Sequence, residues 1–271
     1  MLYNTFMIIA AISDTHGELP PLDNKDCSAA FLCGDIFDAY DHGVLVQQEF
    51  VHTSLIPWIK SFQIPTYIVG GNHDILFERY GPPEELLEVA TYLQDDSTTI
   101  ESDGDTFKVW GSPWTHKIGK WAFDVDEMVR GNRNIVIDPE GDKHRIKYSY
   151  AQEGISLSKQ FAMIPEDTDI LITHSPPYGI KDSRGSGAVE SVDIADVPFL
   201  PNEAHWGSPS LRKKVAETKP TVHLFGHSHN SGIVEKEGTL FANVSYLDDD
   251  YEIADSSWTY IEIEGKTASA V

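Results

Sequence analysis

Residues that can ligate a metal ion or move a proton follow an apolar run in the N-terminal half of the chain. The tetrapeptide Gly71-Asn72-His73-Asp74 comes just after the apolar residues 65–69, so we expect it in a loop that leaves the carboxyl end of a buried strand. Asn and Asp offer oxygen ligands, and His offers a ligand nitrogen or a proton donor. Because Gly-Asn is also ordinary turn chemistry, this tetrapeptide alone does not define a site.

Four other junctions between an apolar run and a polar loop carry the same residue types. They hold Asp14 with His16, Asp35, His174, and His227 with His229. A lone Asp after a strand is more often a turn or cap residue, and a lone His is often a hydrogen-bonded core residue. In open α/β sheets, however, ligands collect beyond the carboxyl ends of the strands. Five coincidences at the same structural position are harder to explain than one shared site.

The types of these side chains indicate a metal centre. Mixed carboxylate, imidazole and amide ligands suit Mn²⁺, Fe, Zn²⁺ or Ni²⁺ better than Ca²⁺ or a structural thiolate zinc site. The seven ligand-type side chains, with His73 left aside, are more than one ion needs. Two ions about 3.5–4 Å apart that share a carboxylate are the usual arrangement for phosphoester hydrolysis. We therefore expect two divalent ions, with Mn²⁺ as the first choice and Fe, Zn²⁺, Ni²⁺ or Mg²⁺ as alternatives.

Apolar runs and turn signals predict the elements that position these residues. Strands are expected at 6–12, 29–33, 66–69, 98–100, 107–110, 170–173, 221–225, 239–245 and 258–263. Helices are expected at 44–62 with a kink or split at Pro57, from 82 or 83 to 93, at 153–163, and from 209 to 218 after a cap at Ser208. Strands that alternate with helices and are followed by more strands predict an α/β sandwich of two sheets with helices outside.

No internal repeat or linker interrupts this pattern, so residues 1–271 are expected to form a single domain. Residues 124–150 are polar and irregular, and we interpret them as a surface insertion. Residues 181–203 lack periodicity and predict a long loop, which in a compact domain is often functional.

The net charge of −23, from 43 acidic and 20 basic residues, restricts the class of partner. A broad basic face for nucleic acid is not expected, and docking on an anionic membrane is disfavoured. The charge is most simply explained by solubility or by a salty cytoplasm. An anionic substrate would be repelled at long range unless bound cations or local Arg and Lys reverse the field at the site. The expected partner is a small-molecule phosphoester, and no pattern indicates an oligomeric state.

The cysteines and the first apolar run indicate the compartment. The two cysteines, Cys27 and Cys33, suggest no disulfide framework, and Cys33 is expected to be a small buried hydrophobic residue. Residues 6–12 are too short to span a bilayer and lack the flanks of a signal peptide. A reducing, cytoplasmic location is therefore expected.

Taken in order, the motifs resemble those of the calcineurin-like metallophosphoesterases. They are Asp14-x-His16, Gly34-Asp35-x-x-Asp38, Gly71-Asn72-His73-Asp74, His174 and Gly226-His227-x-His229. A closer likeness, to the metallophosphoesterase-domain-containing (MPPED) branch, rests on 92–95, 110–114, 164–174, 176–179 and 241–245. The resemblance covers nearly the whole chain and implies a metallo-dependent phosphatase-like, four-layer α/β/β/α fold. Some members of the branch carry Gly in place of the first His of the last motif, whereas this chain keeps His227. The segment 124–150 departs from the branch and leaves the size of the substrate open.

The resemblance also implies roles for the site residues. One ion would be held by Asp14, His16, Asp35 and His229, and the other by Asp35, Asn72, His174 and His227, with Asp35 bridging. His73 would face the phosphate as a charge stabiliser or as a proton donor to the leaving oxygen. Asp74 would orient a neighbouring imidazole. Asp38 would do the same or cap a helix.

Metal-assisted hydrolysis of a phosphoester follows as the expected function. The resemblance implies small phosphodiesters, including cyclic nucleotides; the alternatives are a phosphomonoesterase or protein phosphatase, or a metal-binding interaction module without catalysis. The intact ligand set argues against the last alternative. Candidate substrate contacts are His73, Trp114, Trp121, Tyr178 and Trp206, with Lys181, Arg184 and His205 on the long loop. For each aromatic residue core packing is the alternative, and for the loop cations it is ordinary solvent exposure.

Overall fold

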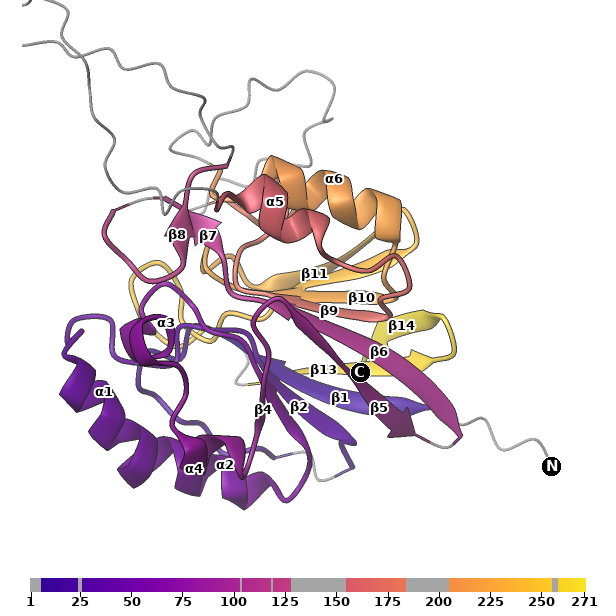
Figure 1. Ribbon diagram of the computed structural model, residues 1–271. Helices are drawn as coiled ribbons and strands as arrows, with labels where there is room; N and C mark the ends of the chain where they lie inside the picture. Colours follow the sequence, from indigo (N-terminus) through magenta and orange to yellow (C-terminus); the bar gives the residue numbers. More distant parts are fainter. Residues whose placement is uncertain are drawn as a thin grey trace, which may run out of the picture.

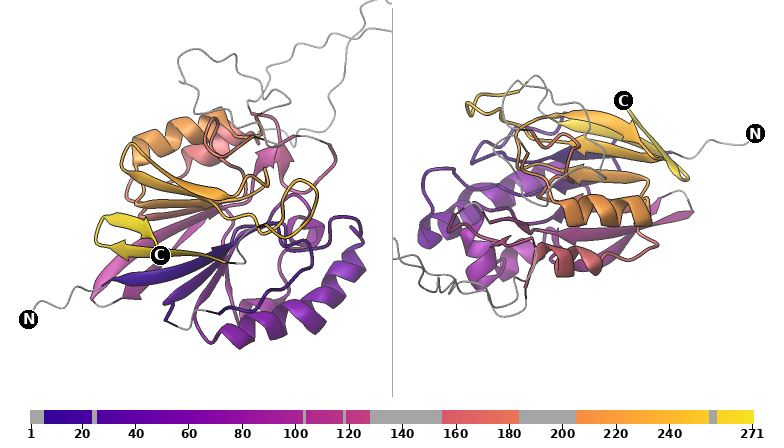
Figure 2. Two further views of the ribbon diagram at one scale, coloured as in Figure 1. Left: turned by 180° about the vertical axis from the view of Figure 1, so that it is seen from behind. Right: turned by 90° about the horizontal axis from the view of Figure 1, so that it is seen from above.

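The computed structural model describes residues 6–23, 26–102, 104–117, 119–127, 155–183, 205–254 and 258–271. In these ranges two six-stranded sheets pack face to face. Helices cover the two outer faces (Figure 1; Figure 2). This arrangement confirms the expected four-layer α/β/β/α fold.

The first sheet contains the strands from the N-terminal part of the chain and the two C-terminal strands. They are β1 (Met7–Ile12), β2 (Ala29–Leu32), β3 (Thr66–Ile68), β4 (Thr91–Tyr92), β13 (Thr259–Glu264) and β14 (Thr267–Ala270), in the order β14-β13-β1-β2-β3-β4. Strands β1 to β4 run parallel, and β13 pairs with β1 antiparallel.

The second sheet contains the central strands of the chain. They are β5 (Asp96–Ser102), β6 (Asp105–Ser112), β9 (Ile170–Thr173), β10 (Val222–Phe225), β11 (Gly232–Lys236) and β12 (Thr239–Asn243), in the order β11-β12-β10-β9-β6-β5. The four inner strands run parallel to one another. The isolated parallel bridge between Ser13 and Ser245 ties the end of β1 to the segment after β12, so the carboxyl edges of the two sheets meet there.

The strands are continuous apolar runs because both of their faces are buried. In β1, Met7, Ile9 and Ala11 belong to the core between the two sheets. Ala10 and Ile12, which alternate with them, belong to the core beneath the helices. Side chains of a strand point alternately to opposite faces, so a strand covered on both sides has no polar positions to show a period of two.

Within the described ranges, helices lie on the outer faces of both sheets (Figure 1). On the first sheet lie α1 (Val44–Phe50), α2 (Ile56–Phe62), α3 (Ile75–Tyr80) and α4 (Glu84–Leu87), and on the second α5 (Leu157–Ala162) and α6 (Pro209–Thr218). The π-helical turn Val51–Leu55 joins α1 to α2, and Pro57 lies in the first turn of α2. The irregularity expected at Pro57 therefore takes the form of a π-helical turn.

The helix expected up to residue 93 is wrong in extent. Only α4 is helical there, and Thr91–Tyr92 forms β4, which pairs in parallel with β3. The N–H of Leu93 donates to the carbonyl oxygen of Ile68, which fixes the chain as the edge of the sheet. Tertiary pairing therefore overrides the helical pattern. Helix α3, directly after Asp74, is an element that the sequence pattern did not predict.

The two helices expected in the second half of the chain are present. Ser208 caps α6 by accepting a hydrogen bond from the N–H of Leu211, and Ser156 caps α5, which is shorter than expected. The first residues of the expected insertion form β8 (Asp124–Val125), which pairs with β7 (Thr115–His116). Residues 128–154 of the expected insertion and residues 184–204 of the long loop lie outside the described residues.

Cys27 and Cys33 are buried free thiols. Over the described ranges, none of the helices has the length and apolar character needed to cross a bilayer.

Candidate metal centre

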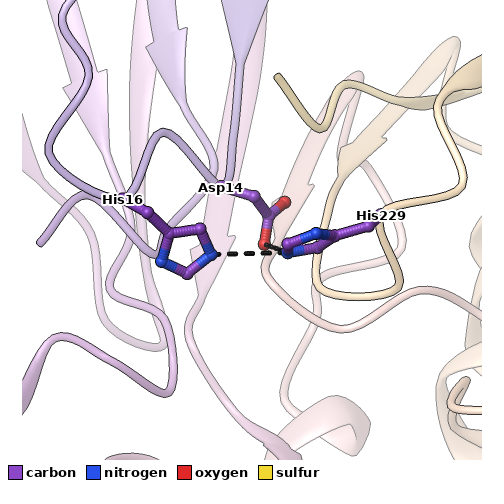
Figure 3. Close-up of side chains that lie close together, drawn as sticks. All are labelled: Asp14, His16 and His229. Atoms are coloured by element: carbon purple, nitrogen blue, oxygen red, sulfur yellow. Dashed lines mark hydrogen bonds and ion pairs between the residues drawn. The ribbon is translucent and has the colours of Figure 1, made fainter. Parts of the chain in front are cut away.

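Carboxylate and imidazole groups from both sheets converge at the shared carboxyl edge. Three groups of side chains have ligand atoms within 4.8 Å of one another, and they are Asp14 with His16 and His229, His16 with Asp35 and His73, and Asp35 with His174 and His227. Figure 3 shows the first group, in which Asp14 and His16 come from the loop after β1 and His229 from the loop after β10. Side chains that are more than 200 residues apart in sequence therefore face one point.

The first group leaves a space between imidazole nitrogens. Nε2 of His16 lies 3.3 Å from Nε2 of His229, and that nitrogen lies 3.5 Å from Oδ1 of Asp14 (Figure 3). The Nδ1–H of His229 donates to the carbonyl oxygen of Asp248 at 2.7 Å, which leaves Nε2 free to face Asp14 and His16. Such a hydrogen bond from the remote nitrogen is the usual way of orienting a metal-ligating histidine.

The third group, Asp35 with His174 and His227, repeats this arrangement. The Nδ1–H of His174 donates to the carbonyl oxygen of Cys33 at 2.9 Å. Its Nε2 lies 3.2 Å from Oδ2 of Asp35 and 3.1 Å from Oδ1 of Asn72. The imidazole of His227 completes the group, and its ring lies 5.1 Å from that of His174. The structure thus brings together residues of both ligand sets that the resemblance implies, and Asp35 lies near His16 as well as near His174 and His227.

The backbone of the ligand loops is strained. Asp14, His16, Asp35, His227 and His229 all have positive φ, between 44° and 69°. L-residues pay about 1–3 kcal/mol for each such conformation, and it persists only where the surrounding structure enforces it. Left-handed backbone at five candidate ligands is the kind of strain that functional sites store.

Glycines allow the ligand loops to pack against one another. A Cβ on Gly71 would overlap the backbone nitrogen and Oδ1 of Asp35, and one on Gly226 would overlap Oδ2 of Asp14. A Cβ on Gly34 would lie 2.6 Å from Nδ1 of His174. Close approach of loops therefore explains the Gly that precedes Asp35, Asn72 and His227.

Asp74 holds two of these loops together. Its carboxylate accepts hydrogen bonds from the backbone N–H groups of Asp35, Ile36, Phe37 and Gly71, at 2.7–3.2 Å. Both oxygens are therefore used on backbone, and the contacts do not show the imidazole partner expected from the resemblance. Asp38 likewise accepts from the N–H groups of Tyr40 and Asp41, so its observed contacts are those of a turn cap.

The buried charges of the site shift the pKa values in opposite directions. Burial opposes ionisation of Asp14 and Asp35, but the imidazoles of His229 and His174 hold the pKa of each carboxyl well below its usual range. Burial also opposes charge on His174 and His229, but the same carboxylates raise the pKa of each imidazole to about 9.

The other imidazoles of the site are disfavoured as cations. Burial lowers the pKa of His16 to about 4, and burial together with the nearby His174 lowers that of His227 to about 3. Burial also lowers the pKa of His73. The neutral form of an imidazole, which these shifts favour, is the form that ligates metals.

The geometry and the donor set fit divalent ions. Nε2 of His227 is buried without a hydrogen-bond partner, and a buried nitrogen in that state is costly unless something else satisfies it. The buried carboxylates Asp14 and Asp35 require positive charge nearby. Two divalent ions would meet both requirements, one beside Asp14, His16 and His229 and the other beside Asp35, His174 and His227.

A hollow of about 390 Å³ opens next to the candidate ligands. It is lined by Asp35, Ala39, Tyr40, Asn72, His73, Trp121, Trp206, His227, His229, Asp249 and Tyr251. Trp121 packs on the ring of His73 at 4.5 Å, and Trp206 packs on that of His227 at 5.3 Å. Among these lining residues there is no Lys or Arg, so the described part of the hollow offers aromatic walls and candidate metal ligands.

Several expected substrate contacts lie elsewhere. Trp114 is buried in the core, where its indole N–H donates to Asp95. Tyr178 packs on the ring of His205, whose Nδ1 lies 2.9 Å from Oδ1 of Asp182. Neither Trp114, Tyr178 nor His205 is among the described residues that line the hollow, whereas His73 is.

Two basic residues of the long loop, Lys181 and Arg184, were also expected to contact the substrate. Lys181 donates to the carbonyl oxygen of Ser231, and Arg184 lies outside the described residues.

Four lining residues were not predicted. Ala39 and Tyr40 follow the Asp35 motif, and Asp249 and Tyr251 belong to an acidic loop near the C-terminus. Their only signal in the sequence is that they lie a few residues beyond a candidate ligand or strand.

Comparison with known proteins identifies relatives of this chain. A family model for the calcineurin-like phosphoesterases matches residues 7–231. Human metallophosphoesterase domain-containing protein 1 is 26% identical over 276 residues, which cover 89% of this chain and 66% of the human protein. A UPF0046 protein of Caenorhabditis elegans is 24% identical over 256 residues, which cover 89% of this chain and 70% of the worm protein. The resemblance stated from the motifs is therefore confirmed, and the matched part is about two thirds of each relative.

Solved structures share the fold. One matches with a TM-score of 0.55 at 14% identity over 98% of each chain. A putative 5′-nucleotidase from Staphylococcus aureus, in complex with alpha-ketoglutarate, matches with a TM-score of 0.50 at 13% identity, over 98% of this chain and 53% of that one. At these identities the likeness shows the fold alone.

The close approach of Gly71 to Asp35 leads to a first prediction. Replacing Gly71 by Ala should displace Asp35 and weaken binding of both ions, because the added Cβ overlaps two atoms of Asp35. Metal content after dialysis, measured by plasma mass spectrometry, tests this. Gly238→Ala is the matched control, since its Cβ would meet nothing within 4 Å although φ is +85°. Wild-type metal content in Gly71→Ala would show that the approach is not required.

The raised pKa values lead to a second prediction. Between pH 6.5 and about 9 the metal-free protein holds protons on His174 and His229, and an ion must displace them to bind. Apparent affinity for Mn²⁺ or Zn²⁺ should therefore rise with pH across this window. Calorimetry at pH 7.5 in buffers of different ionisation enthalpy should count about two protons released per chain. The exposed-histidine variant His52→Ala should release the same number, and binding without proton release would contradict the assignment.

Proposed function

The chain belongs to the calcineurin-like phosphoesterase family of metal-dependent phosphoester hydrolases, and we propose that it hydrolyses small phosphodiesters of the nucleotide type, cyclic nucleotides included. The observation that carries the proposal is the pair of ligand groups that meet at Asp35 beside His73. One ion would be held by Asp14, His16, Asp35 and His229, and the other by Asp35, Asn72, His174 and His227. Bound there, divalent ions supply Lewis-acid polarisation of the phosphoryl group and activation of the attacking water.

The chain's own contribution to the reaction centres on His73. Its Nε2 lies 3.9 Å from Oδ2 of Asp35, so this nitrogen faces the metal centre and the hollow. The backbone N–H of His73 donates to Oδ1 of Asp35 at 2.7 Å, which fixes the loop relative to that carboxylate. From this position Nε2–H donates a hydrogen bond to the phosphoryl group and stabilises the charge that develops there; from the doubly protonated ring it passes its Nε2 proton to the leaving oxygen and becomes neutral.

The lining of the hollow favours a diester over a monoester. A phosphodiester carries one negative charge at neutral pH, whereas a phosphomonoester carries about −1.5 to −2. With no Lys or Arg among the described lining residues and with Asp249 at the rim, the lower charge is easier to accept. The aromatic walls Trp121, Trp206 and Tyr40 offer planar faces for a nucleobase, a contact worth about 1–3 kcal/mol per base.

The proposal also names Mn²⁺ as the metal ion and the cytoplasm as the compartment. A mixed set of carboxylate, imidazole and amide ligands suits Mn²⁺, which we take as the working ion. Two free buried thiols agree with a reducing compartment, the cytoplasm in our proposal. The net charge of −23 supports a small-molecule substrate over a nucleic-acid polymer.

Hydrolysis of bis-p-nitrophenyl phosphate tests the function. We expect turnover with Mn²⁺, loss of turnover after chelation, and recovery when Mn²⁺ is restored. His73→Ala should keep both ions and lose about 10²–10⁴-fold in kcat, the usual contribution of a general acid. A panel of 2′,3′- and 3′,5′-cyclic nucleotides, dinucleotides and phosphomonoesters then ranks the substrates.

Three outcomes would contradict the proposal or a part of it. Absence of hydrolysis with every ion would favour a metal-binding interaction module. Higher kcat/KM for monoesters than for all diesters would identify a phosphomonoesterase. Full turnover by His73→Ala with both ions bound would remove His73 from the mechanism.

A further inference from the structure

His42 hydrogen-bonds the side of His73 that faces away from the metal centre. It lies in the segment before α1 and is half-buried. Its Nε2 lies 3.0 Å from Nδ1 of His73. The other nitrogen of His73, Nε2, is the one that faces Asp35. Whichever of the two rings donates, the bond uses Nδ1 of His73 and leaves Nε2 for the hollow.

The backbone of His73 is already fixed without His42. Its N–H donates to Asp35, and its carbonyl oxygen accepts from Nε2 of Gln47 at 2.8 Å. Gln47 is buried, and its Oε1 accepts in turn from the N–H of Leu76 at 2.8 Å. What remains free is rotation of the His73 ring about its side-chain torsions, and that rotation decides where Nε2 points.

Trp121 restricts the same ring from the side. Its ring lies 4.5 Å from that of His73 and 4.8 Å from that of His42, the latter edge-on at 81°. The indole, tilted by 43° to the His73 ring, alone allows that ring to flip by 180°, because a ring contact does not distinguish the nitrogens Nδ1 and Nε2 from the carbons Cδ2 and Cε1 that replace them after a flip. The hydrogen bond to His42 does distinguish them.

No carboxylate among the described residues performs this task. Asp38, the nearest acidic residue after Asp35 in the loop, accepts from Tyr40 and Asp41. Both oxygens of Asp74 accept from backbone N–H groups. The 3.9 Å between His73 and Asp35 is too long for a hydrogen bond.

The surroundings of His42 separate it from the substrate. It lines a second hollow of about 340 Å³, together with Ile75, Arg79, Lys120 and Trp121, and is not among the described residues that line the first. Among the described residues, the contacts that link His42 to the first hollow are its hydrogen bond to Nδ1 of His73 and its ring contact with Trp121.

We propose that His42 is the positioning residue for His73: its hydrogen bond fixes the ring orientation and the tautomer that present Nε2 to the phosphoryl group. This inference rests on the role of His73 in the proposed function. It assigns His42 no contact with substrate or metal.

Kinetics of His42→Ala and His42→Gln in the Mn²⁺-loaded enzyme test the proposal. His42→Ala should lower kcat by about 10–100-fold, as losses of orienting partners do, with metal content unchanged and KM within about two-fold. Gln places an amide near the position of Nε2 and should recover part of the loss. The loss should be larger for a diester with an alkyl leaving group than for bis-p-nitrophenyl phosphate, because a poor leaving group depends more on His73. His52→Ala, the loss of an exposed histidine, should leave kcat unchanged.

A double-mutant cycle separates positioning from general destabilisation. In the His73→Ala background, His42→Ala should change kcat by less than about two-fold, because residues that act through one another are not additive. The same loss in both backgrounds, equal losses for all leaving groups, or loss of metal would overturn the proposal.

A structural measurement keeps the test independent of activity. Long-range ¹H–¹⁵N spectra of the Zn²⁺-loaded protein should show one protonated and one unprotonated ring nitrogen for His73, and averaged signals in His42→Ala. Averaged signals in the wild type would overturn the positioning role even in an active enzyme. If the wild type hydrolyses no phosphoester yet shows a single His73 tautomer that depends on His42, the proposed function fails while the positioning contact stands.

Discussion

The structure depends on compensating the negative charge of two buried carboxylates. Asp14 and Asp35 are 0% and 2% exposed, and they lie where the carboxyl edges of both sheets meet. An isolated anion in such a place is unstable, so each carboxylate needs positive charge within a few ångströms. Without ions, protons on His174 and His229 provide it, which is why the pKa of each imidazole rises. Divalent ions would provide it more fully, and one of them would also satisfy the unpaired Nε2 of His227.

Much of the local structure serves to hold that charge in place. Ligand residues take left-handed backbone conformations, glycines let the loops touch, and Asp74 gathers four backbone N–H groups from two loops. The strain is sustained by the rigid strands that precede each loop, whose side chains are packed on both faces. The fold thus contributes stability, and the strained loops use part of it to present ligands.

The sequence predicted the strands and the candidate ligands, because there the residue types and their order along the chain point to the same structure. Strands such as β1, buried on both faces, are continuous apolar runs, and the candidate ligands come directly after such runs. Where tertiary contacts decide, prediction failed. Leu86, Ala90 and Leu93 share a helical spacing, yet pairing of Thr91–Tyr92 with β3 ends the helix early.

Side-chain direction was equally hidden from the sequence. Aromatic type alone does not say that Trp114 points into the core and Trp121 into the hollow. His42 lies in a loop without apolar periodicity, so nothing local marks it as the partner of His73. Its role depends on a contact between residues 31 positions apart.

The central claim is that Asp35 lies between two divalent ions. Anomalous diffraction from Mn²⁺-soaked crystals, recorded above the manganese absorption edge, measures this directly. The account predicts two peaks about 3.5–4 Å apart, with a carboxylate oxygen of Asp35 in contact with both. A single peak at full occupancy, or two peaks of which only one contacts Asp35, would contradict it.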